Sequence, residues 1–112
     1  MHTITKANTE NAKNWRININ VIVPLFLSKG VSYDFENNAD FRLYVRNIFN
    51  RYLNRDWGDL GEKDWELNDL AVDNRDDRIL ARYKDPNSNF EDIYIITEWD
   101  FSATTILFTD EY

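Results

Sequence analysis

The chain has 112 residues, of which 43% are hydrophobic and 15% aromatic, and it carries a formal net charge of -7. This length suits one domain with a single core, and the aromatic content is higher than disordered chains carry. The lack of cysteine excludes disulfides and thiolate chemistry, and no apolar run reaches the ~20 residues of a membrane span, so we expect a cytoplasmic protein.

The N-terminal part is predicted to hold a flexible polar arm over residues 1–14, followed by a single α+β domain over residues 15–112. Apolar and polar residues alternate from Trp15 to Leu27, which indicates a half-buried strand. Because proline cannot donate to a ladder, this strand should end at Pro24 or lie at a sheet edge. The next segment, residues 27–37, is predicted to be a loop built around Gly30.

Two helices are predicted next. Asn38 is a good N-cap, and Asp40 lies in the first turn, where the helix dipole favours negative charge. The apolar face of this first helix comprises Phe41, Val45, Ile48, Phe49, Tyr52 and Leu53. Its other surface carries arginines that are either solvated or paired with acids of the same chain, namely Arg42, Arg46, Arg51 and Arg55. The second helix is expected from about Glu62 to Asn74, with a weaker apolar stripe of Trp65, Leu67, Leu70, Ala71 and Val72.

Three strands are predicted in the remainder, over residues 78–84, 91–98 and 103–109. Asp85, Pro86 and Asn87 form a turn sequence between the first two. The last two strands alternate over matching lengths around a short polar loop and should form a central hairpin, with helices covering one side. The expected fold class is therefore α+β, an antiparallel sheet of three to four strands packed against two helices.

Candidate catalytic chemistry is sparse in the sequence. The acids between residues 56 and 77 are numerous, and Asp56 and Asp59 could approach each other across a turn to hold a metal in a hydrolase or nuclease. The chain lacks a histidine near them, because its one histidine is His2. There is also no nucleophile elbow and no Gly-rich phosphate loop. We expect no catalytic residue, metal site or cofactor, and keep the metal-dependent enzyme as an alternative.

The charges are unevenly placed along the chain. Residues 1–55 hold eight Lys/Arg and four Asp/Glu, a net +4, whereas residues 56–112 hold five and sixteen, a net -11. Such an acidic half repels nucleic acid and attracts basic protein surfaces. Trp57 and Trp99 are flanked by acids and could anchor a partner, unless each packs in the core. The predicted partner-binding residues are Asp56, Trp57, Asp59, Asp73, Asp76, Asp77, Glu98, Trp99 and Asp100.

From about residue 51 to the end, the chain resembles a widespread family of small bacterial proteins that are labelled plasmid-related. The resemblance is carried by "RDWGDL", "RILARY" and "IYIITEWDFSATTILFTDEY", in this order. Two positions depart from the family pattern, since Arg55 replaces a Gly and Phe101 replaces an Arg that could pair with Glu98 or Asp100. The matching positions are Asp56, Trp57, Gly58, Asp59, Asn68, Arg78, Tyr83, Thr97, Glu98, Asp100, Thr104, Thr105, Glu111 and Tyr112.

The resemblance implies a mobile-element context and no particular reaction. Small acidic proteins of such elements often inhibit host defence by covering a basic nucleic-acid channel, as anti-CRISPR and anti-restriction proteins do. Charge complementarity suits that mechanism. The expected function is therefore a non-catalytic inhibitor, monomer or homodimer, of a basic partner protein. An antitoxin-like regulatory partner is a further alternative.

Overall fold

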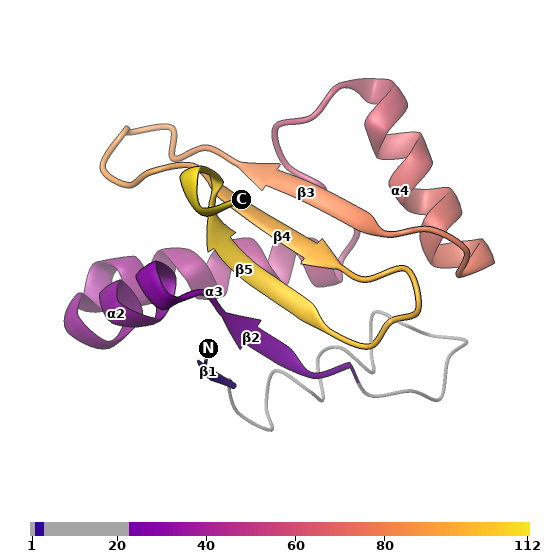
Figure 1. The fold of residues 1–112 in the computed structure, drawn as a ribbon. Helices are drawn as coiled ribbons and strands as arrows, with labels where there is room; N and C mark the ends of the chain where they lie inside the picture. The colour runs from indigo at the N-terminus through magenta and orange to yellow at the C-terminus, as the bar shows by residue number, and fades with distance from the viewer. Residues whose placement is uncertain (1, 4–22) are drawn as a thin grey trace.

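A computed structural model describes residues 2–3 and 23–112 of the chain. All strands lie in one sheet in the order β1-β2-β5-β4-β3, and α2 and α3 lie together on one face of it (Figure 1). The α+β class is confirmed. The elements in chain order are β1 (His2–Thr3), β2 (Leu25–Leu27), α2 (Lys29–Asn37), α3 (Ala39–Leu53), α4 (Glu62–Asn74), β3 (Ile79–Tyr83), β4 (Ile93–Thr97), β5 (Thr104–Phe108) and the 3-10 helix η1 (Thr109–Glu111).

The sheet is mixed, whereas a purely antiparallel sheet was predicted. The hairpins β3–β4 and β4–β5 are antiparallel, as is the pair of β2 with the two-residue β1. The exception is β2, which runs parallel to β5 with Leu25 opposite Thr104 and Leu27 opposite Ile106. Parallel neighbours need a long crossover connection, and here three helices and two strands separate β2 from β5 in the chain. The hairpin of β4 and β5 is central, as predicted.

The prediction of a loop around Gly30 is wrong, because residues 29–37 form helix α2. Ser28 is its N-cap, and the Ser28 hydroxyl accepts a hydrogen bond from the Val31 amide at 3.2 Å. Gly30 lies in a helix, where its lack of a side chain leaves room for a close approach of Glu111. A Cβ at this position would lie 2.9 Å from the carboxylate oxygen of Glu111, near the other end of the described chain.

The strand β2 starts immediately after Pro24 and forms the last part of the segment that was predicted as a strand from Trp15 to Leu27. Proline is tolerated before the first residue of a strand, and the Pro24 carbonyl accepts a hydrogen bond from the Thr104 amide at 2.9 Å. The remainder of the predicted strand, residues 15–22, lies outside the described residues. The same holds for the predicted arm over residues 1–14, apart from β1.

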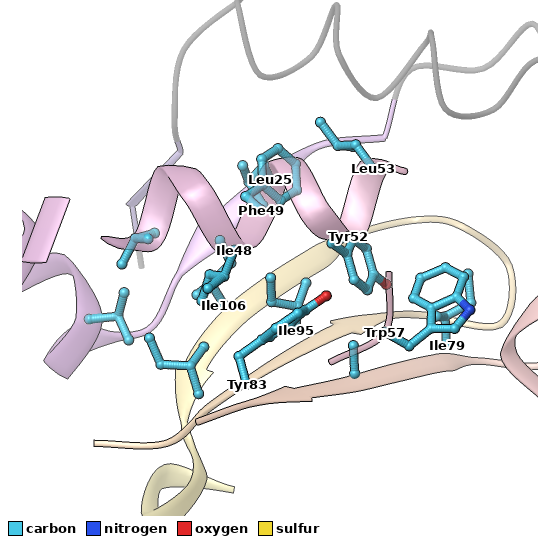
Figure 2. Close-up of a cluster of buried hydrophobic side chains, with 14 of the residues drawn as sticks. Leu25, Ile48, Phe49, Tyr52, Leu53, Trp57, Ile79, Tyr83, Ile95 and Ile106 are labelled. Atoms are coloured by element: carbon cyan, nitrogen blue, oxygen red, sulfur yellow. The ribbon is translucent and has the colours of Figure 1, made fainter. Parts of the chain in front are cut away.

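The core lies between the sheet and α3, and the predicted apolar face of α3 is buried in full. In Figure 2 Tyr52 of α3 points toward the sheet beside Trp57 and Ile95. One polar chain crosses this core: the Tyr52 hydroxyl lies 2.6 Å from the Thr97 hydroxyl, which lies 2.7 Å from that of Thr104. Since Thr97 and Thr104 are opposite each other on β4 and β5, this chain favours one register of the central hairpin.

The C-terminal segment ties α2 to the end of β5 through Glu111. Its carboxylate accepts hydrogen bonds from the Ser28 hydroxyl at 2.6 Å and from the amides of Gly30 at 3.0 Å and Phe108 at 2.9 Å. Partial burial acts to raise the pKa of Glu111, but these hydrogen bonds outweigh it and hold the pKa below its ordinary value. The charged form of Glu111 therefore stabilises the fold.

We expect this contribution to disappear in acid. Because the pKa of Glu111 is lower in the folded state than its ordinary value of 4.5, its contribution is present above that pH and is lost as the pH falls through the folded value. Glu111→Gln should lower the free energy of unfolding by about 1 kcal/mol at neutral pH and flatten its decline below pH ~4.5. Urea unfolding at several pH values measures both. Asp110→Asn is the control, and an equal effect of both variants would contradict this role.

Candidate protein-binding surface

The segment Asp56 to Asp59 closes the free edge of β3. Gly58 forms a parallel bridge with Arg82, the Asp59 amide donates to the Arg82 carbonyl at 2.6 Å, and the Arg82 amide donates to the Trp57 carbonyl at 3.3 Å. Gly58 has a φ of 79°, which glycine adopts readily. This segment covers backbone groups that would otherwise be exposed at a sheet edge.

Trp57 belongs to the core and is fully buried. Its ring packs edge-on against Tyr52 (Figure 2), with centroids 5.2 Å apart, and its indole N–H donates to Asp69 at 3.0 Å. A side chain with no exposed surface cannot contact a partner. The prediction that Trp57 binds a partner is therefore wrong, and Trp57 is a core residue, as the alternative interpretation stated.

The carboxylates of Asp56 and Asp59 bind groups of the same chain. Asp56 accepts from the Arg51 guanidinium at 2.7 Å and 3.2 Å and from the Gly58 amide at 3.1 Å. The hydrogen bond from Arg51, helped by the Gly58 amide and opposed by burial, keeps the pKa of Asp56 below its ordinary value. Asp59 accepts from the Lys84 amide at 2.8 Å. Both carboxylates fasten this segment to its neighbours instead of converging on one point.

A metal site is not formed by these acids. Within residues 23–112, no three His, Asp or Glu side chains are grouped closely enough to hold a metal ion. The alternative of a hydrolase or nuclease that uses Asp56 and Asp59 therefore has no geometric support from these two residues.

Asn68 closes the same edge of β3 from helix α4, which the sequence did not reveal. Its amide nitrogen donates to the Leu80 carbonyl at 2.9 Å, and its carbonyl oxygen accepts from the Leu80 amide at 3.2 Å. The buried side chain thus imitates a neighbouring strand over one residue. A buried Asn in the middle of an amphipathic helix is the sequence signal for such a role, because a buried amide needs partners.

Five of the predicted partner-binding residues lie together at one end of the sheet. Thr97 pairs with both Ile79 and Thr104, so the segment before β3 and the loop between β4 and β5 leave the sheet at the same end. Arg75, which follows α4, lies over the Phe101 ring of that loop at 5.4 Å. We call this surface the acidic end; it comprises Asp76, Asp77, Glu98, Trp99 and Asp100.

The loop of the acidic end holds Trp99 outward and Phe101 inward. Trp99 is 63% exposed, whereas Phe101 has a φ of 60° and is only 3% exposed. The Phe101 amide donates to the Glu98 carbonyl at 2.9 Å, and the Glu98 amide donates to the Ala103 carbonyl at 3.0 Å. Phe101, which departs from the plasmid-related pattern, anchors the loop through its buried ring.

The acids of the acidic end differ from the other predicted acids in their pairing. Asp56 pairs with Arg51, and Asp73 pairs with Arg55 at 2.9 Å, so arginines in and just after α3 neutralise these two. Within residues 23–112, no Lys or Arg side chain comes within 4 Å of the carboxylates of Asp76, Asp77, Glu98 or Asp100. Hydrogen bonds from the side chain and backbone of Ser102 also hold the pKa of Asp100 below its ordinary value.

Helix α4 turns two leucines of its predicted stripe outward. Trp65, Ala71 and Val72 pack inward as expected, but Leu67 and Leu70 are each 53% exposed. The buried position between them in the helix belongs to Asn68, which the edge of β3 requires. The interpretation of Leu67 and Leu70 as core residues is wrong.

No family model, curated protein or solved structure matches the chain. Among the described helices, none has both the length and the apolar character that crossing a membrane requires. The inference of function therefore depends on the geometry of this chain.

Proposed function

We propose that this protein is a non-catalytic, cytoplasmic inhibitor encoded by a mobile element, which binds a basic nucleic-acid-binding surface of a host-defence protein. Anti-CRISPR or anti-restriction activity is the form we favour, and the chain would act as a monomer or homodimer. One observation carries the proposal. An exposed tryptophan, Trp99, lies at the same end of the sheet as four carboxylates that are not paired with a base of the described chain.

Charge and an aromatic anchor act together at this surface. Trp is among the residues that contribute most to binding when an interface buries them, and Trp99 has most of its surface available. The surrounding carboxylates attract Lys and Arg and speed association with a basic protein. Such a surface imitates the negative charge of a nucleic acid and competes with it for the same site.

The first experiment tests inhibition directly. Purified restriction and Cas effector complexes are incubated with the full-length protein, and their binding to labelled cognate DNA is measured in ~0.05 M and ~0.5 M salt. We expect at least one complex to lose DNA binding at low salt and to recover it at high salt, because salt screens exposed charges. Undiminished DNA binding by every complex would overturn the proposed activity. A regulatory, antitoxin-like role would then be tested with proteins encoded beside this one.

The second experiment tests the acidic end. Trp99→Ala should weaken inhibition by about 30-fold, the loss expected for an anchor worth ~2 kcal/mol. Changing Asp76, Asp77, Glu98 and Asp100 together to Asn should reduce the salt dependence. Tyr33→Ala is the matched control, since Tyr33 is also 63% exposed but lies on α2. If Trp99→Ala inhibits as well as Tyr33→Ala does, the acidic end is not the binding surface.

A further inference from the structure

Helix α4 presents an apolar pair on its outer face. Leu67 and Leu70 stand one turn apart, and about half of each side chain is exposed. The buried side of α4 is already committed to the fold through Asn68, Ala71 and Val72. The two leucines are thus not needed for the core and form a small exposed apolar surface that a partner can bury.

A groove with a volume of about 310 Å³ lies beside this pair, between α4 and β3. Three leucines supply its apolar surface, and two carboxylates, those of Asp64 and Asp77, belong to its lining. Its remaining polar groups are already bound, because Asn68 pairs with the backbone of Leu80, and Arg78 donates a hydrogen bond to the Tyr112 hydroxyl. The full lining is Leu60, Asp64, Leu67, Asn68, Asp77, Arg78 and Leu80.

We propose that this groove binds an amphipathic, basic helix of the partner protein. An aliphatic side chain of that helix would enter the groove against Leu67, and flanking Lys or Arg side chains would meet Asp64 and Asp77. Amphipathic helices bind apolar grooves in this way, through anchor residues about one turn apart. This inference rests on the proposed function and names the structural element by which the partner is recognised.

The charge around the groove excludes other occupants. Residues 60–80, which span the groove, hold seven Asp/Glu and three Lys/Arg, and one of these bases, Arg78, belongs to the lining. A second copy of the chain would bring the same acids face to face, and like charges placed together in an interface are strongly unfavourable. Nucleic acid and anionic membrane surfaces are repelled for the same reason. A partner segment with an apolar side chain flanked by positive charges can contact the leucines and pair with the carboxylates at the same time.

The test uses a synthetic probe of that chemistry. The isotope-labelled full-length protein is titrated with a Leu/Lys peptide of about four helical turns whose leucines share one face. Amide chemical shifts should change mainly over residues 60–80. A second peptide of equal composition, with its leucines dispersed around the helix, should bind at least ~10-fold more weakly, since it cannot place two anchors together.

Paired variants locate the binding site. Leu67→Ser combined with Leu70→Ser should weaken peptide binding by at least ~10-fold, because the change removes one apolar wall of the groove and the exposed apolar surface one turn away. Leu43→Ser is the matched control, since Leu43 is 62% exposed on α3, away from the groove. Asp64→Asn combined with Asp77→Asn should lower the affinity at low salt and reduce its salt dependence. All the replaced side chains are exposed, and the amide spectra verify that each variant is folded.

The inference is overturned by any of three results: absence of binding, shifts outside residues 60–80, or equal affinity of the Leu67/Leu70 double variant and the Leu43→Ser control. The DNA-binding assay distinguishes failure of this inference from failure of the proposed function. If the protein inhibits DNA binding but does not bind the peptide, the groove is not the site that recognises the partner, and the proposed inhibitor function stands. If the protein binds the peptide but inhibits no complex, the groove stands as a binding site and the anti-defence activity is rejected.

Discussion

Replacing Trp57 by alanine is expected to lower the free energy of unfolding by about 3–5 kcal/mol, a large part of the ~5–15 kcal/mol that stabilises a typical domain. The indole is fully buried, and its removal leaves a cavity beneath Tyr52, with which it shares an edge-on contact. The change also deprives Asp69 of its hydrogen bond from the indole N–H. Trp57 therefore connects α3, α4 and the edge of β3 in one contact network.

Urea unfolding followed by far-ultraviolet circular dichroism measures this effect, because fluorescence would change with the tryptophan itself. Trp57→Phe keeps an aromatic ring but loses the N–H, and it should be destabilised by less than Trp57→Ala. This second variant keeps the prediction measurable if the first does not fold. Trp99→Ala is the control and should stay within ~0.5 kcal/mol, since Trp99 is 63% exposed. Equal destabilisation by Trp57→Ala and Trp99→Ala would show that Trp57 is not a core residue.

Several positions on which the predicted resemblance to plasmid-related proteins depends are architectural in this fold. The Tyr83 hydroxyl donates to the Asp56 carbonyl at 2.8 Å, Asn68 caps the edge of β3, and Glu111 fastens α2 to the end of β5. A binding function must therefore use residues that the fold leaves free. The acidic end and the groove beside α4 satisfy this condition, and they lie next to each other because Asp77 belongs to the acidic end and also lines the groove.

Local signals were sufficient to predict α3, α4 and the central hairpin. The N-cap Asn38 accepts a hydrogen bond from the Phe41 amide at 3.1 Å, as its place before an apolar stripe predicted. Helix α4 has the predicted bounds, from Glu62 to Asn74. Asp85 accepts hydrogen bonds from the amides of Asn87 and Asn89, which confirms the turn between β3 and β4. Each of these features depends on residues close together in the chain.

The features that the sequence did not reveal depend on distant contacts. Gly30 resembles a loop glycine until Glu111, 81 positions later, is placed beside it. The parallel pairing of β2 with β5 is likewise invisible to a local pattern. Periodicity finds the apolar residues of α4 but does not determine the rotation of the helix. Asn68 takes the buried position because it hydrogen-bonds to the edge of β3 at Leu80, and Leu67 is exposed as a consequence.

Replacing Gly58 by alanine is expected to disrupt the closed edge of β3. An added Cβ would lie 2.1 Å from the Arg82 carbonyl oxygen and 2.7 Å from the Tyr83 ring. The carbonyl belongs to the backbone of β3 and cannot move aside without breaking the bridge between the two segments. The φ of 79° adds strain of about 1 kcal/mol or more for a residue with a side chain. We therefore expect a loss of at least ~3 kcal/mol in the free energy of unfolding, or failure to fold.

Gly61→Ala provides the matched control for this substitution. Gly61 is the N-cap of α4 and has an ordinary φ of -67°, and a Cβ there would meet nothing within 4 Å. Its replacement should lower the stability by less than ~1 kcal/mol. If Gly58→Ala still folds, hydrogen exchange should show faster exchange at the amides of Arg82 and Asp59, whose hydrogen bonds join the two segments. Equal stability of the two variants, with unchanged protection of these amides, would mean that Gly58 and Arg82 do not approach each other as described, and Trp57 would then lose the segment that holds it beneath Tyr52.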